Sequence, residues 1–246
     1  MLTHLLPATT RVIHCDLCGS ASGELLASHD RYGFAIPFIK CTCGLYRMGE
    51  RPADLFAFYN HGTYRDLVSA YHGRRIDATT IQTEQIEYAE DLEAFLCPRV
   101  FDKVMDVGGS TGVVSRYLAA LWKGTVTIID PAGDEIKHAR GCERICGTAE
   151  TFNPKFRRWD IALVCQTIEH LESPRTVLTN LRSCCESLFI DVVDVAQFES
   201  PRRAAKLDHT WGFDDNAVRK MLAVCGWKVI SSQRRASHIG YLCSHE

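Results

Sequence analysis

Residues 104–118 carry the clearest structural signal in this chain, and they read Val104-Met105-Asp106-Val107-Gly108-Gly109-Ser110-Thr111-Gly112-Val113-Val114-Ser115-Arg116-Tyr117-Leu118. A short apolar run ends at an acidic residue, glycines follow, and apolar side chains then recur at helical spacing, which indicates strand, tight turn and helix. Glycines let the backbone approach a ligand closely, and the first amides of the helix are free to bind it. A dinucleotide fingerprint would need glycines at Ser110 and Val113, so the stretch predicts a nucleotide-type cradle of another kind.

A second apolar run also ends in an acid. Residues 125–130 are rich in β-branched side chains and end at Asp130, which follows Gly108 by 22 residues. In a doubly wound sheet the ends of the first two strands are neighbours, so the carboxylate of Asp130 can accept the hydroxyls of a ribose. The alternative is a turn aspartate before Pro131.

Strand-like and helix-like segments alternate from residue 103 onward. Strands are expected near 143–146, 159–165 and 188–193, helices at 174–185 and 214–225, and an antiparallel pair at 227–232 and 239–243. This alternation predicts a doubly wound, mostly parallel sheet covered on both faces. Ligands bind such sheets at the carboxyl ends of the strands. Asp106, Asp130, the loop around Thr148 and Ala149, and Gln166 all fall there.

Four cysteines near the N-terminus form two close pairs. Cys15 and Cys18 are followed by Gly19, and Cys41 and Cys43 by Gly44. Two such pairs can hold one Zn²⁺ tetrahedrally, and a structural zinc contributes on the order of 10 kcal/mol to folding a region with few aliphatic residues. Because the second spacing is unusual, the alternatives are a histidine ligand (His14, His29 or His61) in place of one cysteine, or two unrelated buried pairs.

Composition limits the class of protein. The chain has 246 residues, 46% of them hydrophobic, and a formal net charge of −2, which predicts a soluble globular protein without a broad basic surface for nucleic acid or membranes. Most of the 12 cysteines stand singly in apolar segments, as expected in a reducing compartment. Residues 1–11 lack a signal-peptide pattern and no long apolar span follows, so we expect a cytoplasmic protein.

Between the cysteine pairs and the cradle, residues 51–71 are rich in aromatic side chains. These can line a lid or pocket, or pack one small domain on another. Apolar residues then recur at helical spacing over residues 77–96, and Pro98 ends that helix. We expect three units: a zinc-binding domain at 1–50, a helical linker or lid at 51–100, and the sheet domain at 101–246.

Asp106 to Gly112, with an acidic residue leading a glycine series in which Ser110 replaces the middle glycine, resembles motif I of the class I S-adenosylmethionine-dependent methyltransferases. Asp130, the loop 147–150 and the block 160–174 match the same family in order, and the last block resembles its "EH-x-x-x-P" pattern through Glu169, His170 and Pro174. The N-terminal cysteines resemble a subgroup with an N-terminal zinc-binding domain, which includes sugar C-methyltransferases of antibiotic pathways. Residues 208–213 resemble the "H-x-x-x-F" segment of that subgroup.

The resemblance implies a Rossmann-like class I methyltransferase fold that binds S-adenosylmethionine (SAM), and a structural zinc on Cys15, Cys18, Cys41 and Cys43. The implied cofactor-binding residues are Asp106, Gly108, Gly109, Ser110, Gly112, Asp130, Pro131, Thr148, Ala149 and Gln166. Ser110 departs from the motif and crowds the turn. Sugar C-methyltransferases are often much longer, so their substrate is not implied.

Glu169 and His170 follow the fourth strand at the ligand edge. Histidine has an ordinary pKa of ~6.5, near working pH, so His170 suits a general base, with Glu169 orienting it or binding substrate hydroxyls. His209 is a second candidate for a catalytic or substrate-binding role. Alternatives are a purely structural role for Glu169 and His170, or a metal site made of Glu169, His170 and His209.

We therefore expect a SAM-dependent methyltransferase acting on a small molecule, a sugar or other secondary metabolite. One alternative is an RNA methyltransferase whose zinc unit grips RNA, with phosphate contacts from Arg47, Arg51, Arg65, Arg74 and Arg75, although the charge balance does not favour it. Another is a non-catalytic protein that retains the fold and binds SAM.

Overall fold

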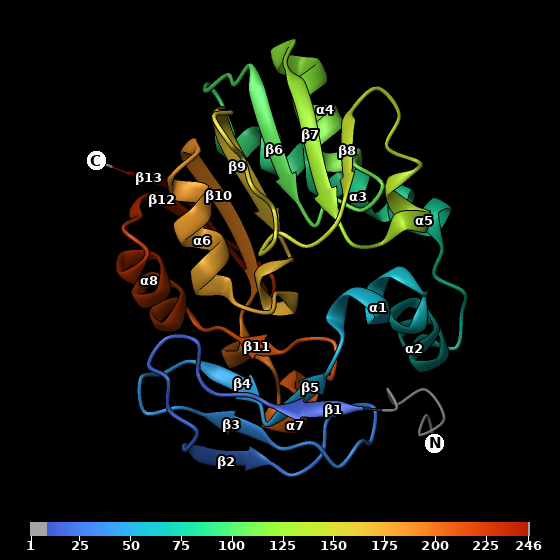
Figure 1. The fold of residues 1–246 in the computed structure, drawn as a ribbon, viewed down its shortest axis with the longest axis vertical. Coiled ribbons are helices and arrows are strands. Elements are labelled where there is room, and N and C mark those ends of the chain that lie inside the picture. Colours follow the sequence, from blue (N-terminus) through green and yellow to red (C-terminus); the bar gives the residue numbers. More distant parts are fainter. Residues whose placement is uncertain (1–8, 246) are drawn as a thin grey trace.

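The computed structural model describes residues 9–245, so residues 1–8 of the expected zinc-binding unit lie outside the described residues, as does residue 246. The described chain forms a large sheet and a small one, with helices α1 (Leu55–Asn60) and α2 (Thr63–His72) beside the gap between them (Figure 1). The carboxyl ends of the parallel strands in the large sheet point toward the small sheet.

The large sheet has seven strands in the order β12-β13-β10-β9-β6-β7-β8. Their bounds are β6 Lys103–Val107, β7 Thr125–Asp130, β8 Glu143–Cys146, β9 Trp159–Cys165, β10 Cys185–Val193, β12 Lys228–Arg235 and β13 His238–Ser244. The strands from β10 to β8 pair in parallel, whereas β13 pairs antiparallel with both of its neighbours, β10 and β12. The predicted doubly wound, mostly parallel sheet with a terminal antiparallel pair is therefore confirmed.

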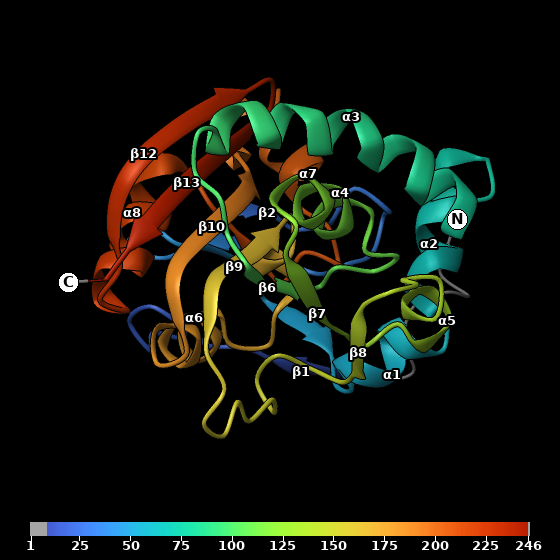
Figure 2. The ribbon, with the colours of Figure 1, turned by 90° about the horizontal axis from the view of Figure 1, so that it is seen from above.

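Helices cover both faces of this sheet (Figure 2). Apolar residues of α3 (Ala78–Leu96) and α4 (Val113–Trp122) share one buried cluster with the sheet, and α5 (Gly133–Ile136) joins it. Residues of α6 (Pro174–Arg182) and α8 (Asp215–Val224) belong to the cluster on the opposite face. Each helix therefore buries its apolar side against the sheet, as the spacing of these residues predicts.

Three of the helices begin at a side-chain cap, and one predicted helix end is wrong. The side chains of Asp77, Ser173 and Asp214 accept hydrogen bonds from the first turns of α3, α6 and α8. Helix α6 ends at Arg182 and β10 begins at Cys185, so Cys185 belongs to the strand and not to the helix. Cys184 and Cys185 are both buried. Because the buried apolar residues continue from the helix into the strand, their spacing does not show where the helix ends.

The small sheet combines remote parts of the chain. Strands β2 (Glu24–Ala27), β3 (Phe38–Lys40) and β4 (Tyr46–Met48) are consecutive, but the fourth strand is β11 (Trp211–Gly212), which pairs antiparallel with β4. Strands β1 (Thr10–Val12) and β5 (Glu50–Pro52) form a separate ladder, and α7 (Pro201–Ala204) contributes Ala204 to the core of this unit. The proposed boundary at residue 50 stays a prediction, and the N-terminal unit is integrated with residues far beyond it.

The order in which the chain adds strands to the large sheet reverses at β6. The strands after β6 are added first on the β7 side and then on the β9 side, with the connections on opposite faces of the sheet. In open α/β sheets this switch point leaves a crevice at the carboxyl ends of the strands, where ligands bind. Within residues 9–245 no helix has both the length and the apolar composition needed to cross a bilayer.

Candidate functional site

A cavity of about 930 Å³ opens at the carboxyl edge of the large sheet. Its walls come from the turn after β6, the ends of β7 and β9, helices α1 to α3, and the segment 206–209. Pockets for single drug-sized ligands measure ~300–1,000 Å³, so this volume gives room for a nucleoside-type ligand and a small second molecule.

The turn after β6 needs glycine for steric reasons. Gly108 has φ +73°, and a Cβ there would stand 2.4 Å from the Thr167 side chain, which comes from the loop after β9. At Gly109 a Cβ would stand 2.3 Å from the Asp106 carboxylate, and at Gly112, with φ +70°, 2.5 Å from Ile128. Contacts this short are not tolerated, so the turn is fitted to its neighbours and held in one shape.

Asp130 at the end of β7 is tied to this turn. Its carboxylate accepts hydrogen bonds from the amides of Ser110 at 2.8 Å and Ala132 at 2.7 Å. Burial raises the pKa of Asp130 to about 6, and these two amides partly offset the rise. Carboxylate oxygens have further lone pairs, so Asp130 keeps the capacity to accept a ligand hydroxyl.

The predicted cofactor-binding residues divide into two groups. Those that line the cavity are Gly108, Ser110, Asp130, Pro131, Thr148, Ala149 and Gln166. The other three, Asp106, Gly109 and Gly112, do not line the cavity and form the underside of the turn. Asp106 is 4% exposed, and burial raises its pKa to about 7.

Helices α1 and α2 cover the cavity from the side of α5. Arg65 forms a bidentate ion pair with Glu135, and Asn60 accepts a hydrogen bond from the Gly133 amide at 3.1 Å. Tyr59 and Tyr64 line the cavity, whereas Phe58 is buried in the N-terminal core. The aromatic stretch therefore serves both of its proposed uses, since part of it forms a pocket wall and part packs two units together.

The other end of the cavity contains an unpaired carboxylate. Glu169 belongs to the short 3-10 helix η2 (Ile168–His170), is 2% exposed, and lines the cavity. Neither of its carboxylate oxygens has a hydrogen-bond partner within residues 9–245. Burial raises its pKa to about 7, although the nearby positive charge of Lys206 acts in the opposite direction. A buried carboxylate without a partner is costly, and this one is available to a ligand.

His170 lies next to it in a fixed orientation. Its Nδ1 is 2.6 Å from the carbonyl oxygen of Asp208 and 3.0 Å from the Tyr59 hydroxyl. Because a carbonyl oxygen only accepts, Nδ1 carries the proton and Nε2 of the neutral ring keeps its lone pair. Burial lowers the pKa of His170 to about 4, so the ring is neutral at pH 7.

His209 lies close to His170, but its Nε2 is in contact with Lys206. The two rings are 4.5 Å apart between centroids, and Nε2 of His209 lies 3.2 Å from Nζ of Lys206. Burial first, and then the Lys206 charge, lower the pKa of His209 well below its usual range. Asp208 completes this cluster and accepts a hydrogen bond from the Tyr32 hydroxyl at 2.6 Å. His170 therefore has the more accessible basic nitrogen.

A metal site at this end receives weak support. Ligand atoms of His170, Asp208 and His209 lie within 4.8 Å of one another, and Glu169, part of the set expected from the sequence, is not in this group. The Lys206 ammonium next to His209 would repel a divalent cation.

The family comparison agrees with this geometry. Residues 81–232 match the family model described as "Methyltransferase domain". The chain belongs to this methyltransferase family. The predicted resemblance to class I SAM-dependent methyltransferases is thereby confirmed, while the comparison with curated proteins finds no match.

Solved structures share the fold of this methyltransferase. The plantazolicin methyltransferase BpumL in complex with SAH aligns with TM-score 0.57 and 12% identity, covering 78% of this chain and 94% of that one. Magnesium protoporphyrin IX methyltransferase (ChlM) from Synechocystis PCC 6803 with bound SAM gives 0.53 and 13%, covering 78% and 98%. Human N-acetylserotonin methyltransferase in complex with SAM gives 0.58 and 14%, covering 78% and 59%. At these identities the likeness concerns the fold alone.

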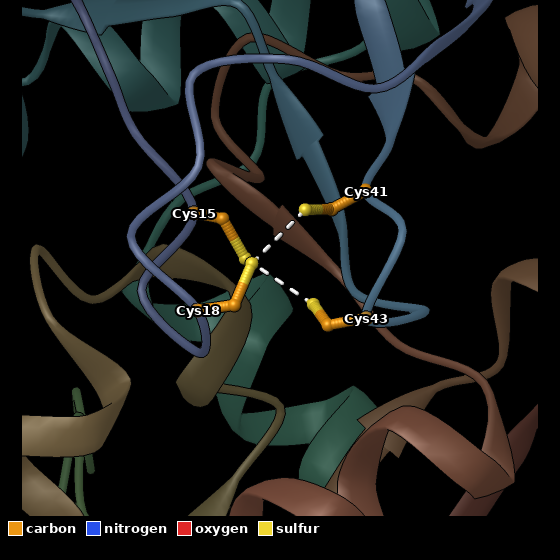
Figure 3. A group of neighbouring side chains, drawn as sticks. All are labelled: Cys15, Cys18, Cys41 and Cys43. Atoms are coloured by element: carbon orange, nitrogen blue, oxygen red, sulfur yellow. Dashed lines mark hydrogen bonds between the residues drawn. The ribbon is translucent and has the colours of Figure 1, made fainter.

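The methyltransferase also brings its four N-terminal cysteines together. The sulfur atoms of Cys15, Cys18, Cys41 and Cys43 point toward one another from two loops (Figure 3) and lie within 4.8 Å of one another. Two of the separations are 3.4 Å (Cys15 to Cys43) and 3.3 Å (Cys18 to Cys41), near the ~3.8 Å between thiolates of a tetrahedral zinc site with ~2.3 Å bonds. His14, His29 and His61 do not belong to this group, so the C-x-C spacing does not prevent four sulfur ligands.

Two of the arginines suggested for phosphate contacts are buried in the methyltransferase, and the other three form ion pairs closer to its surface. Arg47 is 1% exposed and donates to backbone carbonyls, and Arg51 is 3% exposed and pairs with Glu172. The other three form ion pairs, Arg65 with Glu135, Arg74 with Glu84 and Arg75 with Asp77. Arg74 and Arg75 remain exposed on the surface, so the RNA alternative stays a prediction.

Sequence reasoning assigned no role to several cavity residues. Thr167, Lys206, Asp208 and Glu135 line the cavity. Thr167 and Asp208 lie within stretches that carry the family resemblance but received no role of their own, and Lys206 and Glu135 belong to no motif that we used. The cluster of charges directly before His209 was a usable signal for Lys206 and Asp208. No sequence signal pointed to Glu135, because only the fold brings Arg65 close enough to form an ion pair with it.

Proposed function

We propose that this protein transfers the methyl group of SAM to a small molecule, either a sugar or another secondary metabolite. Membership of the methyltransferase family, the glycine turn at the switch point and a cavity with room for two molecules support this proposal. SAM supplies an electrophilic methyl group on a positively charged sulfur when it is bound. The residues of this chain then bind, orient and deprotonate the acceptor.

Asp130 and the turn after β6 would hold the cofactor. The Gly108 backbone borders the cavity, and the Asp130 carboxylate is placed beside it by the Ser110 amide. Thr148, Ala149 and Gln166 line the same end of the cavity and complete this proposed set. Any side chain at Gly108 would collide with Thr167, so the residue there is glycine and its bare backbone borders the cavity, where a ligand can approach it.

His170 would act as the general base. The Asp208 carbonyl holds the Nδ1 proton, so Nε2 can take a proton from an acceptor hydroxyl as that oxygen forms its new bond to carbon. The acceptor proton then resides on Nε2 and leaves to solvent after product release. Proton transfer by a positioned group contributes typically ~100-fold or more to the rate.

Glu169 would bind the acceptor. Its two unpaired oxygens suit hydroxyl donors, and its position next to His170 places such donors near the base. A sugar or another polyhydroxylated compound offers several neighbouring hydroxyls, which can contact Glu169 and His170 together. His209 and Lys206 would close the same end by contacting oxygen atoms of the acceptor.

The fixed tautomer of His170 carries this proposal, and a pair of measurements tests it. Methyl transfer from radiolabelled SAM to panels of sugars, polyols and phenols identifies an acceptor, and calorimetry with S-adenosylhomocysteine (SAH) measures the cofactor site separately. We expect SAH to bind and at least one hydroxylated acceptor to be methylated. SAH binding without methylation of any panel would instead support a non-catalytic SAM-binding protein, and no SAH binding would refute the cofactor site.

We further propose that Cys15, Cys18, Cys41 and Cys43 hold one structural Zn²⁺. Metal analysis of purified protein should give about one zinc per chain, and Cys18→Ser should lose it together with the order of residues 11–50. Ser20→Ala, on the same loop, is the control and should keep the metal. Full protection of the 11–50 amides in a metal-free protein would contradict the assignment.

A further inference from the structure

One carboxylate connects the cysteine group to the loop that carries Glu169 and His170. Asp16 lies between Cys15 and Cys18 in sequence, yet its side chain reaches helix α6. Its Oδ1 accepts a hydrogen bond from the Ser173 hydroxyl at 2.9 Å, and its Oδ2 accepts one from the Arg175 amide at 2.7 Å. Asp16 therefore caps the N-terminus of α6 from another part of the chain.

The capped helix end is also the end of the catalytic loop. Residues 166–173 lead from β9 to α6, with Glu169 and His170 in the middle of this loop. Ser173 is the N-cap residue of α6 and stands three residues after His170. A shift of the α6 terminus is therefore transmitted over a short, hydrogen-bonded segment to the proposed base.

The N-terminal unit holds this loop at neighbouring points as well. Glu172 accepts hydrogen bonds from Arg51, a buried residue of β5, and from Arg11 of β1. The Trp211 indole donates to the Leu171 carbonyl at 2.8 Å. Each of these contacts ties the loop to the unit that contains the cysteines, and Asp16 is the one that comes from the cysteine knuckle itself.

The position of Asp16 depends on the closure of that knuckle. The Cys15 amide donates to the Ser20 carbonyl and the Gly19 amide to the Cys15 carbonyl, so Asp16 sits in a tight turn between two sulfur ligands. Four thiolates held on one metal ion fix such a turn, whereas without the ion the cysteines return to neutral thiols that no longer hold one another, and the turn opens. An opened turn cannot keep both Asp16 hydrogen bonds.

We propose that Asp16 is a positioning residue. When the four cysteines Cys15, Cys18, Cys41 and Cys43 close around their metal, Asp16 holds the N-terminus of α6 in place. The fixed helix end in turn holds the loop that carries Glu169 and His170. The inference rests on the proposed function for the role of His170. Its first test needs neither a methyl acceptor nor turnover, so the two can fail separately.

Hydrogen exchange of the full chain tests the link directly. Loss of an N-cap corresponds to about fivefold to tenfold in a local opening equilibrium, so Asp16→Ala should speed exchange of the 166–175 amides by about that factor. Asp16→Asn keeps one accepting oxygen and should fall between Asp16→Ala and the native chain. SAH affinity, measured by calorimetry, should change less than threefold in both variants, because Gly108 and Asp130 are untouched.

A matched control separates this effect from general loss of capping. Asp214 caps α8 by accepting from the Ala217 amide at 2.8 Å and also meets the Tyr46 hydroxyl of the small sheet at 3.3 Å. Asp214→Ala removes a comparable cap and a comparable contact between the two units, but it lies outside the catalytic loop. We expect it to leave exchange of residues 166–173 unchanged.

Metal removal completes the experiment. Stripping the native chain with a chelator should speed exchange of residues 166–173, and the same treatment should add less in Asp16→Ala, because one of the links between the N-terminal unit and this loop is already cut. NMR titration gives an independent signature: the His170 pKa should move upward, toward the ordinary ~6.5, in Asp16→Ala and in the stripped native chain.

Several results would overturn the inference. Unchanged exchange of residues 166–173 and an unchanged His170 titration in Asp16→Ala would show that the cap does not position the loop. Equal effects of the chelator on Asp16→Ala and on the native chain would show that closure reaches the loop by another route. A native protein that contains no metal would refute the cysteine part, while the comparison of Asp16→Ala with Asp214→Ala would still decide the role of the cap.

Discussion

The two ends of the cavity differ in how their polar groups are satisfied. At the end near β6 and β7, the Asp130 carboxylate accepts two backbone amides and the glycines fit closely against their neighbours. At the other end the Glu169 carboxylate has no hydrogen-bond partner within residues 9–245, and the half-buried Lys206 lines the same cavity as the proposed base. The polar groups of the first end are satisfied by the folded chain itself. At the second end, the partner of the buried Glu169 carboxylate has to come from a ligand.

This difference separates stability from function. A satisfied, fitted site adds to the stability of the fold, so its residues cannot be changed without loss of shape. An unsatisfied site costs stability, so the protein retains it for a task in binding or catalysis. Substitutions at the two ends should therefore have different signatures.

The largest expected effect comes from His170→Ala. If Nε2 is the base, turnover should fall about 100-fold or more, while SAH affinity changes less than twofold because the cofactor end is intact. Turnover with the acceptor found in the panels and calorimetry on the same preparation check this. Normal turnover would transfer the role to His209.

The pH dependence of the native enzyme sharpens the same test. The imidazole has to be neutral to accept a proton, and burial lowers the His170 pKa to about 4. Activity that depends on this group should therefore persist well below pH 6 and fall only as the pH approaches about 4, unlike a histidine with an ordinary pKa of ~6.5. An activity limb between about pH 6 and 7 that disappears in His170→Ala would contradict the burial described above.

The second effect concerns the cofactor end. If the Asp130 carboxylate binds the ribose as proposed, Asp130→Ala should lose two charge-assisted bonds at a cost on the order of 2–4 kcal/mol, or ~30-fold or more in affinity. Asp134→Ala, which removes an exposed acid of α5 that pairs with Lys137, is the control. Calorimetry with SAH that gives equal affinities for the two variants would remove Asp130 from the site.

Most of the fold, and the meeting of Asp130 with the glycine turn, could be predicted from the sequence, because local signals carry them. The turn at residues 108–112 and the acid at the end of β7 are adjacent to their strands, so strand order alone brings Asp130 to Ser110. The acceptor end was less predictable. Lys206 and Asp208 reach His170 from a segment 36 to 38 residues away, and β11 joins a sheet made of residues 24–48. Such contacts depend on the whole chain and leave no periodic pattern.

A smaller effect is expected on stability at Glu169. Burial raises its pKa to about 7 from an ordinary 4.5, so the stability associated with the protonated acid is present below about pH 4.5 and is lost as the pH rises through about 7. Glutamine does not ionise, so Glu169→Gln should not lose this stability as the pH rises. The variant should match the native chain at pH 4.5 and be more stable at pH 8 by about 1–3 kcal/mol.

Denaturant unfolding at both pH values checks that prediction. Other buried acids, including Asp106 and Asp130, also titrate in this range, but they are present in both proteins and cancel in the difference. A difference between Glu169→Gln and the native chain that is the same at pH 4.5 and pH 8 would show that Glu169 does not titrate as an unpaired buried acid.

The smallest expected effect is at Ser110, where the chain departs from the glycine motif. Ser110 has φ +50°, a left-handed conformation that costs a non-glycine residue about 1–2 kcal/mol, and its hydroxyl donates to Glu135. Ser110→Gly relieves the strain, but it loses that hydrogen bond and adds disorder to the unfolded chain, each about 1 kcal/mol. We therefore expect a net change in stability within about 1 kcal/mol and SAH affinity within about threefold. Ser110→Ala keeps the strain and loses only the hydroxyl, so it should be less stable than the native chain by about 1 kcal/mol. If Ser110→Gly were instead as damaging as Asp130→Ala, the serine hydroxyl would itself belong to the cofactor site.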